Sequence, residues 1–124
     1  MNRPGIAVVV TGGRKFTDLR FVFATLDRIH AETPIVRLAH GGATGADSLA
    51  DFWAHQNRVP EIKAYEARWD AEGKSAGPLR NVRMLTLEKP DLVVAFPGGR
   101  GTADCVERAI ARGMRVEHYT PGGA

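Results

Sequence analysis

The chain is short of several features that would place it quickly in a class of protein. It has one cysteine in 124 residues, Cys105, so no internal disulfide can form and a reducing compartment is favoured. No apolar run approaches the ~20 residues of a membrane span. The first apolar run, Ile6 to Val10, is too short for a signal peptide. We therefore expect a cytoplasmic protein that does not engage a membrane.

Runs of like charge are also missing. The sequence carries 17 Lys and Arg against 14 Asp and Glu, a formal net charge of +3, but these residues are scattered. Such scatter argues against a nucleic-acid partner, whereas basic residues beside glycine-rich turns suit a small anionic ligand. No cysteine, histidine and carboxylate residues have metal-ligand spacing, so we expect neither a metal nor a resident cofactor.

Strand-like and helix-like segments alternate along the chain. Short Val- and Ile-rich runs predict strands over 6–10, 35–39, 62–65, 92–96 and 116–119. Apolar residues at helical spacing predict helices over 18–29, 46–59, 78–89 and 102–112, and the polar stretch 66–77 is expected to be irregular. We expect one domain over residues 1–120 and a frayed tail over 121–124.

This alternation predicts an α/β protein with a Rossmann-like, three-layer α/β/α sandwich. Five short strands with helical connections favour a five-stranded parallel sheet covered on both faces. Right-handed crossovers then give the strand order 3-2-1-4-5. In such sheets, ligands bind outside the carboxyl ends of the strands, where the order reverses.

Glycine-rich turns follow three of the predicted strands. They are Gly12-Gly13, the stretch from His40 to Gly45, and the stretch from Pro97 to Asp104. Glycine lets the backbone approach an anion closely, and the N-terminus of the following helix offers unpaired N–H groups. None matches the dinucleotide or P-loop motif, and glycines can also serve tight turns alone. Three such turns at one sheet edge nevertheless predict a nucleotide-type site.

Side chains near these turns supply the remaining candidates for ligand contact. Arg14 and Arg80 can neutralise phosphate, and Trp69 can either stack on a base or pack its own loop. His40 either positions its turn or contacts a base. Asp47 and Asp104 either cap helices or accept hydrogen bonds from ribose hydroxyls.

The third turn resembles a known signature. Pro97-Gly98-Gly99-x-Gly101-Thr102 is similar to the P-G-G-x-G-T motif of the SLOG superfamily, which includes the Lonely Guy phosphoribohydrolases and DprA-like proteins. Segments 12–18, 40–47, 77–84 and 95–104 together resemble the smaller YspA-type (YpsA-related) SLOG family. The resemblance implies a Rossmann-like domain that binds a nucleotide or a nucleotide-derived signal. It also implies self-association and a role in bacterial or phage conflict systems.

The resemblance leaves binding and catalysis as alternatives. The phosphoribohydrolases carry glutamate three residues after the motif threonine, where this chain has Cys105. We therefore favour a sensor or sequestering protein for a ligand such as an ADP-ribose relative, over an N-glycosidic hydrolase of nucleoside monophosphates that would use Asp47, Asp104 or Glu107. DNA processing and pterin carriage are further analogies within the superfamily. The predicted ligand contacts are Gly12, Gly13, Arg14, His40, Gly41, Gly42, Asp47, Trp69, Arg80, Asn81, Pro97, Gly98, Gly99, Gly101, Thr102 and Asp104.

Overall fold

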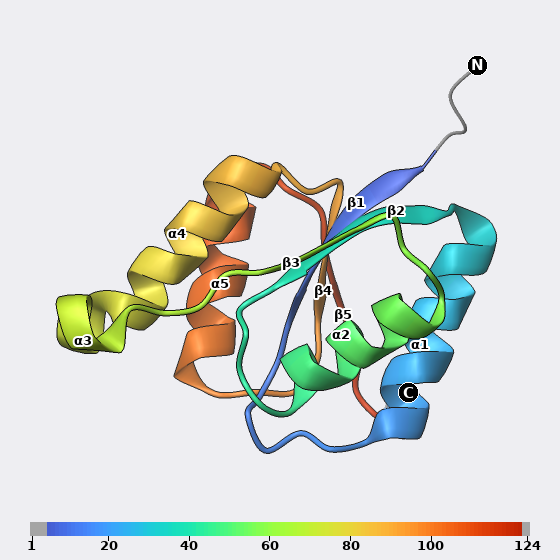
Figure 1. The fold of residues 1–124 in the computed structure, drawn as a ribbon, viewed down its shortest axis with the longest axis horizontal. Coiled ribbons are helices and arrows are strands. Elements are labelled where there is room, and N and C mark those ends of the chain that lie inside the picture. The colour runs from blue at the N-terminus through green and yellow to red at the C-terminus, as the bar shows by residue number, and fades with distance from the viewer. Residues whose placement is uncertain (1–4, 123–124) are drawn as a thin grey trace.

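A computed structural model of the protein describes residues 5–122, and Figure 1 shows its fold. The strands are β1 (Ile6–Thr11), β2 (Ile35–His40), β3 (Glu61–Ala64), β4 (Leu92–Ala95) and β5 (Val116–His118). The helices are α1 (Leu19–Glu32), α2 (Ala46–Gln56), α3 (Trp69–Glu72), α4 (Ala76–Glu88) and α5 (Arg100–Ala111), with a 3-10 turn, η1 (Gly73–Ser75), between α3 and α4. The last part of the predicted tail lies outside the described residues.

The sheet has the predicted topology. Its strand order is β3-β2-β1-β4-β5 and every neighbouring pair is parallel, which confirms the Rossmann-like fold. Helices α1 and α2 cover one face, and α4 and α5 cover the other (Figure 1). The order reverses between β1 and β4, so the carboxyl ends of these two strands flank the switch point at which such folds bind ligands.

Two apolar clusters, one on each face of the sheet, hold the layers together. Along β1, Val8 and Val10 pack toward α1 and α2, whereas Val9 packs toward α4 and α5. This is the alternation expected of a strand buried on both faces. Trp53 is fully buried in the first cluster, and its indole nitrogen donates to Asp27 Oδ1 at 2.8 Å. Cys105 is fully buried in the second cluster.

The prediction of an irregular stretch over 66–77 was wrong. This segment holds α3 and η1, and α4 already begins at Ala76. Neither α3 nor η1 has a buried residue, so the sequence lacks the apolar period that would have revealed them. An ion pair between Glu72 Oε2 and Arg83 Nη1, 3.6 Å apart, links α3 to α4.

Two helices have clear end signals. Asp18 caps α1 by accepting from Phe21 N at 3.0 Å, and Gly113 follows α5 with a φ of +73°. A left-handed residue at that position is the usual glycine stop signal. Helix α5 begins at Arg100, two residues earlier than predicted.

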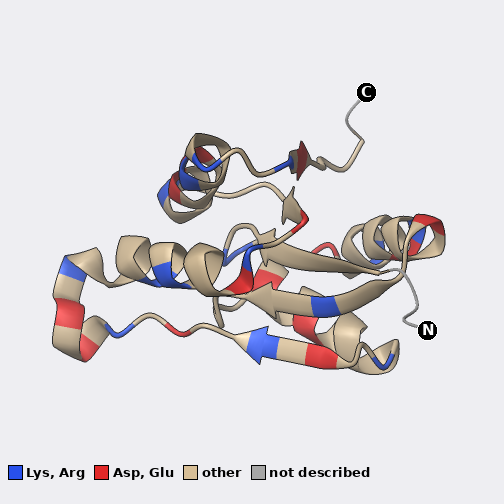
Figure 2. Ribbon diagram, turned by 90° about the horizontal axis from the view of Figure 1, so that it is seen from above, with Lys and Arg blue, Asp and Glu red and all other residues tan. Residues whose placement is uncertain are grey.

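Charge is spread over the described residues without a long run of either sign. Figure 2 shows Lys and Arg interspersed with Asp and Glu on several elements. Within residues 5–122, no helix is both long and apolar enough to cross a lipid bilayer.

Candidate functional site

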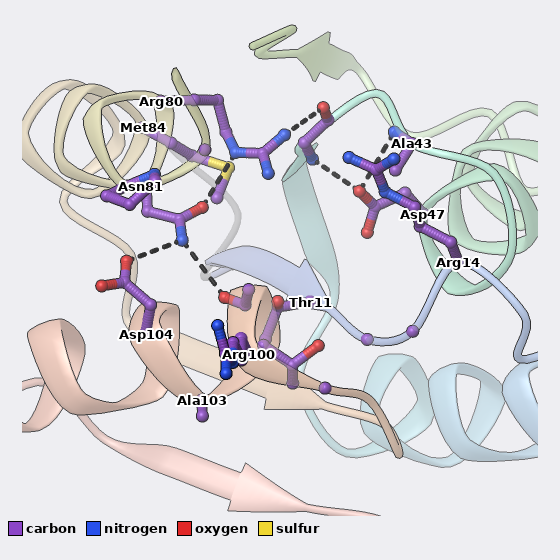
Figure 3. A pocket seen from close by; sticks show the side chains of 18 of the residues that line it. Thr11, Arg14, Ala43, Asp47, Arg80, Asn81, Met84, Arg100, Ala103 and Asp104 are labelled. Atoms are coloured by element: carbon purple, nitrogen blue, oxygen red, sulfur yellow. Dashed lines mark hydrogen bonds between the residues drawn. The ribbon is translucent and has the colours of Figure 1, made fainter. Parts of the chain in front are cut away.

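A cavity of about 740 Å³ lies at the carboxyl ends of the central strands, and Figure 3 shows its lining. The ends of β1 and β2, the start of α5 and the inner side of α4 form its walls. Predicted site residues in this lining are Gly12, Gly13, Arg14, Gly41, Asp47, Trp69, Arg80, Asn81, Gly99, Gly101, Thr102, Asp104 and Glu107.

Four predicted contacts lie elsewhere. Gly42 lines a neighbouring hollow of about 230 Å³ that shares Arg14 and Arg80 with the main cavity. Pro97 and Gly98 line a third hollow, of about 360 Å³, on the β5 side of the α5 start. His40 is buried and lines none of these three hollows.

The first glycine turn is packed against the rest of the protein. A Cβ on Gly12 would lie 2.5 Å from Ala46 Cβ, so only glycine lets α2 approach this closely. The N–H of Gly13 donates to Pro97 O at 2.8 Å, and Gly13 O accepts from Ala46 N at 3.1 Å. These bonds tie the first turn to the other two turns and use the Gly13 N–H that a phosphate would need.

The second turn also satisfies its own amides. Asp47 Oδ2 accepts from Gly41 N at 3.1 Å and from Ala43 N at 3.2 Å. His40 Nδ1 accepts from Gly42 N at 3.0 Å, while its Nε2 lies 2.8 Å from Asp51 Oδ1. His40 therefore positions the turn, which was one of its two predicted roles. With three successive amides engaged, this turn offers little to an anion.

The third turn, at the start of α5, has amides left over. The first intrahelical bond runs from Ala103 N to Gly99 O at 3.0 Å, so the N–H groups of residues 99–102 precede it and have no helical acceptor. Gly99 is the N-cap and has no side chain to cap the helix. A Cβ at Gly99 or Gly101 would meet nothing within 4 Å, and both residues line the cavity.

A chain of polar side chains connects α4 to this helix start and to the second turn. Arg80 donates from Nη1 to Gly41 O and from Nε to Asn81 Oδ1. Asn81 Nδ2 in turn donates to Asp104 Oδ2 at 3.0 Å and to Gly101 O at 3.2 Å. Burial lowers the pKa of the Arg80 guanidinium, partly offset by the nearby Asp47 carboxylate. Arginine stays charged in any case, so Arg80 contributes a fixed positive charge.

The two cavity aspartates have opposite electrostatic surroundings. Burial raises the pKa of Asp47, although His40, Arg80 and the turn amides act against this shift. Desolvation also opposes the ionisation of Asp104, but hydrogen bonds from Asn81 and Arg108 outweigh it and lower the pKa of that carboxyl. Asp104 is thus a carboxylate held by donors, whereas Asp47 is a carboxyl largely removed from water.

The outer rim is aromatic and basic. The Arg14 guanidinium lies over the ring of Trp69, with Cζ 5.4 Å from the ring centroid. Trp69 is about half exposed at 49%, so one part of the ring is available to a ligand. Lys74 and Arg100 also line the cavity.

Residues missed by the prediction include Thr11, Ala43, Gly77, Pro78 and Met84. Thr11 had a usable signal, because it is the first polar residue after the apolar run of β1 and so falls at the ligand-binding edge. Ala43, Gly77, Pro78 and Met84 fall within the segments 40–47 and 77–84 that resemble the family, so the resemblance was the signal for them. Met84 is buried in α4, and it also lines the cavity.

Comparison with known proteins agrees with this architecture. Residues 6–71 match the family model described as the YspA, cpYpsA-related SLOG family. The chain belongs to this family. It is also 37% identical over 121 residues to the Gene 61 protein of Mycobacterium phage D29, an alignment that covers 90% of this chain and 94% of the phage protein.

The SLOG family match spans the first two glycine turns, whereas the third lies beyond residue 71. The position at which the phosphoribohydrolases carry glutamate holds Cys105, which faces the second core cluster. Burial raises the pKa of its thiol to about 11. Cys105 therefore supplies neither a carboxylate nor a ready thiolate to the cavity.

Proposed function

We propose that this SLOG protein binds a nucleotide or nucleotide-derived ligand in the main cavity, with a phosphate at the start of α5. The observation that carries the proposal is the open, uncapped N-terminus of α5 facing a cavity of nucleotide size. Unpaired N–H groups and the positive end of the helix dipole together favour an anion there.

The charges around the cavity support this ligand class. The basic residues Arg14, Lys74, Arg80 and Arg100 outnumber the acidic residues Asp47, Asp104 and Glu107 in its lining. This balance, together with the helix end of α5, favours an anionic ligand. The exposed part of the Trp69 ring offers a stacking surface for a base. A carboxylate ligand would satisfy the helix end but would leave the aromatic rim unused.

Capture of the ligand would let the protein act as a sensor or a sequestering protein, and we extend the proposal to self-association and to a role in bacterial or phage conflict. Light scattering of the purified protein, with and without nucleotide, tests the self-association. A mass equal to one chain under both conditions would contradict that part alone.

Mass spectrometry of bound molecules is the direct test. The purified protein is incubated with a mixture of nucleoside mono- and diphosphates and ADP-ribose, separated from free ligand and denatured. Release of one intact nucleotide in near-stoichiometric amount is the expected result. Recovery of no nucleotide above the level of a bovine serum albumin control would refute the proposal.

Hydrolysis of an N-glycosidic bond is the second candidate, favoured by one observation. Asp47 and Asp104 line one cavity with pKa values shifted in opposite directions, which is the pattern of an acid and its partner carboxylate. Free base and ribose phosphate accumulating beyond one equivalent would show turnover. Turnover that survives in the combined variant Asp47→Asn, Asp104→Asn and Glu107→Gln would exclude this mechanism.

A further inference from the structure

One buried acceptor in the cavity has no partner. Asp47 is only 5% exposed, and its Oδ2 accepts from two amides of the second turn, yet its Oδ1 has no hydrogen-bond partner within the described part of the chain. Figure 3 shows that this second oxygen is directed away from the turn. An unsatisfied buried carboxylate oxygen is costly, so a ligand that donates to it would gain a strong, charge-assisted hydrogen bond.

Asp104, the second of the two aspartates at the cavity wall, is already engaged. Both oxygens of Asp104 lie within hydrogen-bond distance of Arg108 Nε, at 3.1 and 2.9 Å, and Oδ2 also accepts from Asn81. These hydrogen bonds hold Asp104 between α4 and α5. Of the two aspartates predicted to accept from a ribose, Asp47 is the one with a free oxygen.

The sign of the charge decides which end of a nucleotide meets Asp47. A carboxylate repels phosphate, and Asp47 stands in the first turn of α2, where it neutralises the positive end of that helix. The α5 start has no acidic residue in its first turn. The phosphate therefore belongs at α5, and the part of the ligand that reaches Asp47 is an uncharged group that can donate a hydrogen bond.

We propose that Asp47 Oδ1 accepts a hydrogen bond from a ribose hydroxyl of the bound nucleotide, so that the site selects ribonucleotides over deoxyribonucleotides. This inference rests on the proposed nucleotide-binding function. In dinucleotide-binding folds, a carboxylate near the end of the second strand accepts a hydrogen bond from a ribose hydroxyl. Asp47 differs in that it reaches the site from the start of the following helix. An exocyclic amine of the base has the same donor chemistry, and the experiment separates the two.

The variant Asp47→Asn isolates the free oxygen. Its amide oxygen can still accept from Gly41 N and Ala43 N, while an NH₂ group, which cannot accept, replaces Oδ1. Affinities of wild type and variant are measured by calorimetry for ADP, 2′-deoxy-ADP, 3′-deoxy-ADP and IDP, which lacks the exocyclic amine. We expect the variant to bind ADP at least about tenfold more weakly, because a bond to a charged acceptor is lost. For the deoxy analogue that lacks the contacted hydroxyl, the variant and the wild type should bind with nearly equal affinity.

Asp18→Asn is the matched control. It removes the same charge from an exposed helix cap that lies outside the cavity lining, and asparagine caps as well as aspartate does. Its affinity for ADP should equal that of the wild type. Thermal unfolding of both variants verifies that they are folded.

Each alternative outcome contradicts a different statement. Equal ADP affinity in wild type and a folded Asp47→Asn variant would overturn the role of Asp47 and leave nucleotide binding intact. A variant that weakens ADP and both deoxy analogues equally, but not IDP, would assign the donor to the base and overturn the ribose contact. Wild-type protein that binds none of the four nucleotides, and from which the mass-spectrometry test recovers no nucleotide, would overturn the proposed function and this inference together.

Discussion

The glycines of the third turn have different tasks, and substituting them separately tests the proposed anion site. Gly101 lies in the first turn of α5, and a Cβ there would meet nothing within 4 Å. The substitution Gly101→Asp therefore places a carboxylate beside the free N–H groups without a clash. An acidic side chain at this end of a helix is favourable by about 0.3–1 kcal/mol. We expect the variant to be as stable as the wild type, or slightly more stable.

Ligand binding should respond in the opposite direction. Two like unit charges about 5 Å apart at an effective dielectric constant of about 20 repel by roughly 3 kcal/mol, which corresponds to roughly a 100-fold loss of affinity or more. The introduced carboxylate would also occupy the amides that the phosphate needs. Gly101→Ala, which adds a Cβ without charge, should keep most of the wild-type affinity.

Gly98→Ala provides the contrast within the same turn. Its Cβ would clash with Thr102 Oγ1 and lie 2.7 Å from Gly13 N, so the packed turns must move apart. We expect a loss of stability of about 1–3 kcal/mol, typical of overpacking. Thermal unfolding followed by circular dichroism measures the stabilities, and calorimetry with ADP measures the binding. A Gly101→Asp variant with wild-type affinity would refute the anion site at α5.

Three further predictions concern single side chains. Because Asp104 has a lowered pKa, its hydrogen bonds stabilise the fold above its unfolded value of 3.8, and this stabilisation is lost as the pH falls from that value through the lower folded pKa. Asp104→Asn should therefore cost about 1 kcal/mol at pH 7 and progressively less below pH 3.8, as measured by urea denaturation. Because burial raises the pKa of Cys105 to about 11, its thiol should react with an aromatic disulfide reagent at pH 8 only as fast as the protein unfolds, and faster labelling would contradict its burial. Because Trp53 is fully buried and Trp69 half exposed, ADP should change the fluorescence of Trp69 alone, so a signal that persists in Trp69→Phe would disprove the stacking contact.

Strand pattern and connection length were sufficient to predict the sheet order. The apolar runs of β1 and β4 are buried on both faces, and such strands are recognisable without knowing their partners. Once five strands alternate with helices, right-handed crossovers leave few arrangements. The short α3 escaped prediction for the converse reason, because it buries nothing and its sequence carries no apolar period.

The cavity lies at the sheet edge where the glycine turns were predicted to meet, but the sequence did not show how the turns differ. The sequence shows where glycines cluster, but it does not show which amides already have partners. Gly13 donates to Pro97, and the second turn donates to Asp47 and His40. In two of the three glycine-rich turns, amides that could bind a phosphate are therefore already bonded within the protein. The acceptors of these amides become their neighbours only when the three turns meet in the folded protein, so the sequence does not reveal them.

The two parts of the proposed site therefore depend on different features of the chain. The SLOG family match covers residues 6–71, which contain the two internally bonded turns and Asp47, but not the start of α5. The matched segment thus contains Asp47, whereas the proposed anion site rests on the free amides of α5. If both assignments are right, Gly101→Asp removes the phosphate contact while leaving Asp47 in place, and Asp47→Asn removes the sugar contact while leaving the helix end open. The affinity lost in the first variant should then depend on the charge of the ligand, and the affinity lost in the second should depend on its hydroxyl groups.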